Sequence, residues 1–274
     1  MTAAHIAKSL TSTVTLNDGV IMPLFGYGTY KLNDNKQETE KVVLQALKCG
    51  HRLLDTAQFY KNEEEVGTGV RKSGLNRKDI FVVTKVWFTN MGREKCIESV
   101  NESLKKLDIE YIDLILMHTP CKNGKSVETY TALQEFKEKG LVRSVGVSNF
   151  GIQHIEGLIA AGCPLPSVNQ IELNTYFRQK EIVDYCRKKN IAVMGFSPLA
   201  KAKKGFENEV ITSIANKHKK SVAQVMIRWS VQNGFITIPK SSREERINEN
   251  ADVFDFSLEE TDLAAIVSIG SYRC

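Results

Sequence analysis

Four residues that can hold or transfer a proton stand at or just beyond the ends of short apolar runs. Asp55 lies at the end of one run, with Tyr60 just beyond it, and Lys85 and His118 lie at the ends of the next two runs. A lysine in such a run is costly to bury unless it is paired, and Asp55 is the available partner. Singly, each residue also has a structural interpretation, since an aspartate often caps a helix. Together the four favour a site.

The four side chains would make a coherent acid catalyst. A tyrosine with its ordinary pKa of about 10 is a poor proton donor at neutral pH. We expect the ammonium of Lys85 to stabilise the phenolate of Tyr60 and lower the pKa of the phenol, while Asp55 keeps the lysine charged and aimed. A neutral His118 beside the phenol would orient a carbonyl oxygen. This arrangement suits protonation of an oxygen while a hydride arrives at its carbon.

The elements that carry these residues alternate between strands and helices. Some strand-length runs, such as 80–83 and, apart from Asp113, 113–117, are continuously apolar, as in a parallel sheet buried on both faces. The predicted strands are 24–30, 52–57, 80–87, 112–118, 144–149, 167–173, 192–197 and 235–239. Amphipathic helices are predicted between them, for example at 36–48, 93–107, 128–139 and 222–232. The turn chemistry of Asn17-Asp18-Gly19 predicts a β-hairpin within 13–22.

Eight strand–helix units without a break in composition predict one closed (β/α)8 TIM barrel, with 1–274 as a single domain. Functional side chains in such a barrel come from the carboxyl ends of the strands, where these four residues lie. The second choice is an open doubly wound sheet, which normally carries G-x-G-x-x-G after a strand. The nearest candidates begin at Gly26 and Gly67, and neither has the third glycine in place.

The composition restricts the class of protein. The 274 residues include 37 Lys and Arg against 32 Asp and Glu, and 42% of all residues are hydrophobic, as in an ordinary folded chain. No apolar run approaches the roughly 20 residues that span a bilayer, and the first nine residues lack the apolar core of a signal peptide. The six cysteines form no C-x-x-C pair, which indicates reduced thiols. We expect a cytoplasmic monomer that binds no metal, nucleic acid or membrane.

The run D-T-A-Q-F-Y-K-N-E at 55–63 resembles the D-T-A-x-x-Y-x-N-E signature of the aldo-keto reductase superfamily. The spacing from Tyr60 to Lys85 and on to His118 is similar to that of the shorter members, of the prostaglandin F synthase and 2,5-diketogluconate reductase type. The resemblance implies a catalytic tetrad of Asp55, Tyr60, Lys85 and His118, with Tyr60 the general acid in reduction. His118 favours C=O over C=C reduction, because the steroid double-bond reductases of the family carry glutamate there.

The resemblance also implies a nicotinamide cofactor, bound without a glycine-rich motif. Ser148, Asn149 and Gln170 resemble the residues that bind the carboxamide, a task for which hydroxyl and amide groups have suitable donors and acceptors. Phe196 has the position of an aromatic ring that stacks on the nicotinamide, and Ser197 and Leu199 follow it.

The segment 238–250 resembles the family's pocket for the adenosine 2′-phosphate. A helix N-terminus flanked by basic side chains is a general solution for phosphate binding. The residues expected on the phosphate and adenine are Lys240, Ser241, Arg246, Glu249 and Asn250. Ser242 and Arg243 differ from the residues usual there, but Arg243 adds charge of the right sign. The sequence therefore predicts NADPH rather than NADH.

The segments that would line the substrate pocket depart from the family pattern. Thr119 replaces the usual tryptophan after His118, the loop at 121–127 is short, and the chain ends at Cys274, so the C-terminal loop is nearly absent. We expect a shallow, open site that prefers small or activated carbonyls such as methylglyoxal. The residues expected to face the substrate are Tyr30, Phe59, Trp87, Phe88 and His118.

Three functions stay open from the sequence. The first choice is NADPH-dependent reduction of aldehydes and ketones to alcohols. The second is a prostaglandin F synthase that acts on prostaglandin H2, and the third is a catalytically idle, cofactor-binding structural or regulatory protein.

Overall fold

The protein is described from a computed structural model that covers residues 6–32, 36–121, 124–200 and 205–270. Its main sheet contains eight parallel strands that are hydrogen-bonded in chain order. These are β3 (Tyr27–Gly28), β4 (Leu53–Asp55), β5 (Phe81–Val86), β6 (Ile112–Met117), β7 (Val142–Ser148), β8 (Val168–Glu172), β9 (Ala192–Phe196) and β10 (Ile236–Thr237). Each falls within or close to a predicted run.

The first and last strands of this order meet and close the sheet into a barrel. A parallel bridge joins Phe25 to Thr237. The amide of Gly26 donates to the carbonyl of Thr237 at 2.9 Å, and the amide of Gly28 donates to that of Pro239 at 3.0 Å. The predicted (β/α)8 barrel is therefore confirmed, and the carboxyl ends of all eight strands lie at one rim.

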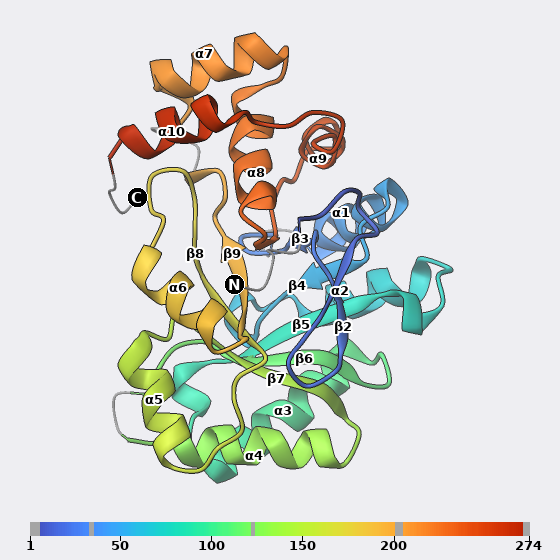
Figure 1. Cartoon of the computed structure of the whole chain (residues 1–274). Coiled ribbons are helices and arrows are strands. Elements are labelled where there is room, and N and C mark those ends of the chain that lie inside the picture. Colours follow the sequence, from blue (N-terminus) through green and yellow to red (C-terminus); the bar gives the residue numbers. More distant parts are fainter. Residues whose placement is uncertain (1–5, 33–35, 122–123, 201–204, 271–274) are drawn as a thin grey trace.

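Helices surround the strands on the outside (Figure 1). The predicted helices at 93–107 and 222–232 coincide with α3 and α8. The ten helices of the described residues are α1 (Lys36–Cys49), α2 (Glu63–Lys72), α3 (Arg93–Leu107), α4 (Ser126–Glu138), α5 (Ile152–Ala160), α6 (Lys180–Lys188), α7 (Glu209–His218), α8 (Val222–Gln232), α9 (Glu244–Ala251) and α10 (Glu260–Ser268). Short 3-10 turns include η1 (Gln58–Tyr60), η2 (Arg77–Asp79) and η3 (Phe88–Asn90).

Alternation along each strand produces two apolar cores. On β6, Leu114 and Leu116 belong to the cluster inside the barrel, whereas Ile115 and Met117 belong to the cluster between the strands and the helices. Because successive side chains of a strand point to opposite faces, the strands must be apolar on both. Lys85 of β5 is buried in this wall, as an exception that needs a partner.

The predicted N-terminal hairpin is present. Strands β1 (Thr13–Thr15) and β2 (Ile21–Pro23) pair antiparallel around a turn in which Gly19 has a φ of +85°. Leu16 and Met22 pack in the same cluster as Leu53 and Phe81, which begin β4 and β5. The hairpin therefore covers the amino end of the barrel and leaves the opposite rim uncovered by it.

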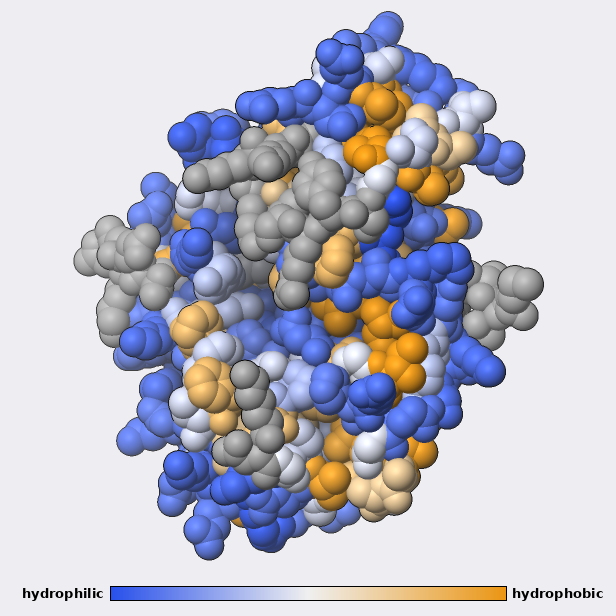
Figure 2. All heavy atoms as spheres, turned by 90° about the vertical axis from the view of Figure 1, so that its left-hand side faces the viewer, coloured by the Kyte–Doolittle hydropathy of each residue, from blue (hydrophilic) through white to orange (hydrophobic). Residues whose placement is uncertain are grey.

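The outer surface is mostly hydrophilic on the face seen in Figure 2, where hydrophobic residues form small separate groups. Among the described residues, none of the helices is long and apolar enough to cross a membrane. The last helix, α10, ends at Ser268, and the end of the predicted short C-terminal loop lies outside the described residues.

Candidate active site

A buried ammonium connects three elements at the carboxyl rim. Nζ of Lys85 donates to Oδ1 of Asp55 at 2.8 Å, to the main-chain carbonyl of Thr56 at 2.8 Å and to the phenol oxygen of Tyr60 at 3.2 Å. All three N–H groups of the amine are therefore used. The predicted pairing of Lys85 with Asp55 is present, and Thr56 is a partner that sequence reasoning did not find, because a main-chain carbonyl leaves no sequence signal.

The turn after β4 places Tyr60. Residues Gln58–Tyr60 form η1, and Lys61 follows in the left-handed conformation with a φ of 55°. Asn62 is buried, donates to the carbonyl of Thr29 at 2.9 Å and accepts from the hydroxyl of Thr56 at 2.7 Å. Hydrogen bonds of the signature residues Thr56 and Asn62 thus hold the loop that carries Tyr60 against the end of β3.

The electrostatics of Tyr60 differ from the sequence-based expectation. Burial raises the pKa of Tyr60 well above its usual value, and the nearby carboxylate of Asp55 adds to the effect. The prediction that Lys85 lowers this pKa is therefore wrong for the protein alone. Burial also lowers the pKa of Lys85, while Asp55 opposes that change. The phenol is thus fully protonated at neutral pH, beside an amine positioned to stabilise the phenolate once the proton has left.

His118 stands directly beyond β6 with its ring edge-to-face against Tyr60, at a centroid distance of 5.7 Å. Burial, helped by the charge of Lys85, lowers the pKa of His118 to about 3. The imidazole is therefore neutral, as the sequence predicted. Its Nδ1 is buried without a hydrogen-bond partner in the described part of the chain.

Aromatic side chains border the tetrad. The rings of Phe59 and Trp87 stack at 4.1 Å, Trp87 lies 4.9 Å from His118, and Tyr30 lies 4.9 Å from Tyr60. Tyr30, Phe59 and Phe88 are 45%, 42% and 52% exposed. All four aromatic residues predicted to face the substrate therefore lie together at the rim, and the half-exposed rings leave the site open.

Three polar side chains predicted to hold a carboxamide meet beside the tetrad. Ser148 and Gln170 are register partners at the ends of β7 and β8. The hydroxyl of Ser148 donates to the carbonyl of Gln170 at 2.9 Å, and the amide of Asn149 donates to the carbonyl of His118 at 3.0 Å. Asn149 is exposed, with a φ of 59°.

Gln170 also has a role that sequence reasoning missed. Its amide nitrogen donates to Oδ2 of Asp55 at 2.7 Å and contacts the sulfur of Met194 at 3.1 Å. Both oxygens of Asp55 are therefore occupied, one by Lys85 and one by Gln170. The contact joins residues 115 positions apart, and only closure of the barrel brings them together.

The remaining predicted cofactor residues follow β9 and β10 at the same rim. Phe196 ends β9 half-buried, and Ser197 and Leu199 continue from it, also half-buried. Beyond β10, Lys240 is half-buried and Ser241 is buried, with its hydroxyl accepting from the amide of Arg243 at 3.1 Å.

Helix α9 carries the rest of this set. Arg246 is exposed, Glu249 is half-buried and Asn250 is buried. Two acidic residues, Glu244 and Glu245, occupy the first turn of the helix. Their negative charges offset the positive end of the helix dipole. An anion here would therefore be attracted by Lys240 and Arg246 more than by the helix N-terminus.

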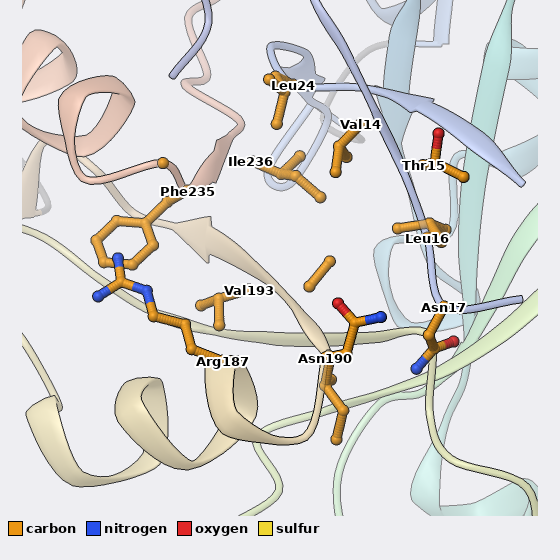
Figure 3. Close-up of a pocket in the computed structure, with 13 residues that line it drawn as sticks. Val14, Thr15, Leu16, Asn17, Leu24, Arg187, Asn190, Val193, Phe235 and Ile236 are labelled. Carbon is orange, nitrogen blue, oxygen red and sulfur yellow. The ribbon is translucent and has the colours of Figure 1, made fainter. Parts of the chain in front are cut away.

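A cavity lies at the other end of the barrel. It measures about 130 Å³ and is lined by the hairpin, by the end of α6 and by the residues that begin β9 and β10, with Arg187 and Asn190 at its polar edge (Figure 3). It is separated from the tetrad by the length of the strands and shares no residue with it.

Comparison with known proteins gives one family. A model described as "Aldo/keto reductase family" matches residues 25–271. The chain is 45% identical to a glyoxal reductase of Bacillus subtilis over 94% of this chain and 92% of that protein. It is 42% identical to a 9,11-endoperoxide prostaglandin H2 reductase of Trypanosoma cruzi over 92% and 89%. It is 40% identical to a methylglyoxal reductase of Yersinia pestis over 93% and 92%.

Solved structures agree with the same fold. A Bombyx mori aldo-keto reductase in complex with NADP superposes with a TM-score of 0.87 at 36% identity, covering 95% of this chain and 93% of that one. A mutant of Gox0644 in complex with NADPH superposes with a TM-score of 0.89 at 39% identity, covering 95% and 94%.

Proposed function

The chain belongs to the aldo/keto reductase family of oxidoreductases, and we propose that it reduces small or activated aldehydes and ketones with NADPH, using Tyr60 as general acid. The observation that carries the proposal is the phenol of Tyr60, which lies 3.2 Å from the buried amine of Lys85 and beside the neutral ring of His118. This group of residues opens to solvent through a border of half-exposed aromatic rings.

The residues of the chain divide the work of protonation. Tyr60 and His118 hydrogen-bond the carbonyl oxygen of the substrate and fix its orientation. Tyr60 gives its phenolic proton to that oxygen as negative charge develops on it. Nζ of Lys85 stabilises the phenolate that remains, and Asp55 keeps the amine charged. The raised pKa of Tyr60 ensures that the donor holds its proton until then.

The polar residues at the rim fit NADPH, which supplies the hydride when bound. Ser148, Asn149 and Gln170 offer the amide and hydroxyl groups that a carboxamide pairs with. Phe196 offers a ring at the end of β9, with Ser197 and Leu199 beside it. The cations Lys240 and Arg246, with Ser241, suit a 2′-phosphate, and Glu249 and Asn250 on the same helix suit the adenine.

The open border of the site supports small carbonyl substrates. In an open site, a bulky substrate makes few additional contacts and so gains little binding energy. The chemical activation of its carbonyl therefore matters more than its size. Relatives named for glyoxal and methylglyoxal agree with this proposal. The relative named for prostaglandin H2 favours reduction of that endoperoxide as a second candidate activity.

The experiment is the loss of NADPH absorbance with a panel of carbonyls, namely methylglyoxal, nitrobenzaldehyde and a steroid ketone, with prostaglandin H2 as a separate arm. We expect turnover of the small carbonyls, and we expect Tyr60→Phe to lower kcat/KM by about 10²- to 10⁴-fold. Tyr185→Phe is a matched control, because Tyr185 lies on α6 outside the site. Turnover of prostaglandin H2 alone would establish the second candidate. No turnover of any substrate by a folded, NADPH-binding protein would indicate the idle, structural or regulatory function.

Each chain carries the complete set of proposed site residues, so the reaction needs no second subunit. In this proposal, 1–274 forms one domain and the enzyme acts as a cytoplasmic monomer.

A further inference from the structure

Tyr27 is a buried tyrosine that the proposed proton transfer does not use. It belongs to β3, and its ring lies in the core between the barrel and the helices, 5.8 Å from the ring of His51. Its hydroxyl donates a hydrogen bond to the main-chain carbonyl of Ser241. Burial raises the pKa of Tyr27, so the phenol remains a donor at neutral pH.

The bond continues the junction that closes the barrel. Main-chain pairing between β3 and the chain after β10 reaches as far as the amide of Gly28 and the carbonyl of Pro239, at 3.0 Å. The fit is close there, since a Cβ on Gly28 would lie 3.2 Å from the carbonyl oxygen of Ile238. Ser241 lies two residues beyond Pro239, and its main-chain carbonyl accepts a hydrogen bond from the hydroxyl of Tyr27. The barrel wall is thereby tied to the segment that leads into α9.

We propose that Tyr27 is a positioning residue that sets the preference for NADPH over NADH. This rests on the proposed function, in which Lys240, Ser241 and Arg246 bind the 2′-phosphate. A segment fixed before the ligand arrives loses less conformational entropy on binding. NADH carries a hydroxyl in place of that phosphate, so it gains nothing at Lys240, Ser241 and Arg246 and depends on the ordered segment only through its adenine. Tyr27 therefore acts on cofactor affinity and not on the protonation of substrate.

The test compares Tyr27→Phe, which keeps the ring and removes the hydroxyl, with Tyr130→Phe, which removes an equally buried hydroxyl on α4. NADPH and NADH are each titrated against the full chain by quenching of tryptophan fluorescence. We expect Tyr27→Phe to weaken NADPH binding by about five- to tenfold, the effect of one lost hydrogen bond. NADH binding should change by less than about twofold, and kcat at saturating NADPH should be unchanged. Tyr130→Phe should change neither cofactor's affinity.

Two further measurements separate the possible failures. Arg246→Ala should also weaken NADPH binding; if it does and Tyr27→Phe does not, Tyr27 has no positioning role and the proposed phosphate site stands. If neither variant affects NADPH, the phosphate site is misplaced and this inference falls with it. Equal weakening of NADPH and NADH by Tyr27→Phe would indicate general disorder and overturn the proposal. Hydrogen exchange of the peptide 239–250 should be faster in Tyr27→Phe; unchanged exchange would also contradict it.

Discussion

Two buried carboxylates, one near each end of the barrel, have the same charge but different surroundings. At the carboxyl rim, Asp55 pairs with Lys85 at 2.8 Å. Near the amino end of β6, Asp113 accepts from Nη2 of Arg77 at 2.6 Å, from Nη1 of Arg143 at 2.7 Å and from the amide of Val82 at 2.9 Å. Both carboxylates are buried in the barrel wall, and each of their oxygens accepts at least one hydrogen bond.

The difference lies in what the partners can release. A guanidinium keeps its charge at any pH at which proteins fold, and a main-chain amide keeps its proton, so the cluster around Asp113 has nothing to transfer. The amine of Lys85 instead donates its third hydrogen to the phenol of Tyr60, which has a transferable proton and stands at the open rim. A buried ion pair is therefore not by itself a sign of catalysis. Contact between such a pair and an accessible group with an exchangeable proton is a better sign.

The largest expected effect comes from breaking the cluster at the rim. Lys85→Met removes the charge that stabilises the phenolate of Tyr60, while Gln170 still donates to Asp55. We expect kcat to fall by about 10³-fold, which corresponds to about 4 kcal/mol of transition-state stabilisation. Single-turnover kinetics with saturating NADPH would measure the loss, and thermal melting would verify that the variant folds. A folded variant that keeps more than about a tenth of the wild-type kcat would contradict the role of Lys85.

The second variant breaks the other cluster. Asp113→Asn leaves Arg77 and Arg143 without their shared counter-charge in the wall. Removal of one partner of a buried pair destabilises by about 3 kcal/mol, and we expect kcat to be unchanged. Urea denaturation and steady-state kinetics on the same preparation give both numbers.

The matched control for Asp113→Asn is an exposed carboxylate. Asp108 is 73% exposed at its side chain, pairs with Arg71 at 3.4 Å and has a left-handed backbone that asparagine tolerates. Asp108→Asn should change the free energy of unfolding by less than about 0.5 kcal/mol. If Asp113→Asn lowers kcat as Lys85→Met does, the two ends of the barrel are not functionally distinct.

The barrel and the meeting of Asp55, Tyr60, Lys85 and His118 at one rim could be predicted because both follow from local pattern. Apolar runs of strand length alternate with amphipathic helices, and the strand-end rule of a parallel barrel then brings Asp55, Lys85 and His118 to one rim. The hairpin followed from turn chemistry at Asn17-Asp18-Gly19. In each case a few neighbouring residues contain the information.

The rest depends on contacts between distant positions and on depth of burial. The predicted strand at 112–118 contains Asp113 in an otherwise apolar run, and the sequence does not reveal its partner Arg77, which lies 36 positions away. The pKa of Tyr60 is raised chiefly because the phenol is buried, and the depth of burial cannot be read from the spacing of the residues. The bonds from Gln170 to Asp55 and from Tyr27 to Ser241 exist only once the barrel has closed.

The third prediction concerns His51, which is uncharged at neutral pH, as is His118. Burial lowers the pKa of His51, just before β4, to about 4, whereas unfolded histidine titrates near about 6.5. Below about pH 6.5 the unfolded chain binds a proton at His51 that the folded chain does not bind. The stability due to neutral His51 is therefore complete above about pH 6.5 and is lost as the pH falls toward about 4.

His51→Phe tests this sign while the ring contact with Phe25, at 5.5 Å, is kept. The variant should lose less stability than the wild type between neutral pH and about pH 5, with a difference of about 2 kcal/mol. Urea denaturation at several pH values measures the slope. Its kcat should equal that of the wild type, unlike that of His118→Phe, which removes a ring nitrogen from the site. An unchanged slope would show that His51 takes up its proton at the same pH in the folded and unfolded chains, and would contradict the lowered pKa.

The smallest expected effect compares an exposed side chain at each end of the barrel. Arg187 edges the amino-end cavity (Figure 3), lies 5.3 Å from the ring of Phe235 and donates to the carbonyl of Asn233. An exposed cation over an aromatic ring contributes at most about 1 kcal/mol, so Arg187→Ala should lower the free energy of unfolding by no more than that.

Phe88 at the opposite rim touches Trp87, with ring centroids 4.7 Å apart. Because that ring borders the proposed substrate site, Phe88→Ala should raise the KM for methylglyoxal, whereas Arg187→Ala should leave both KM and kcat unchanged. The two variants are compared in one kinetic series with NADPH held at saturation. A larger kinetic effect from Arg187→Ala than from Phe88→Ala would mean that the amino-end cavity communicates with the chemistry, and the separation of a structural end from a reactive end would be wrong.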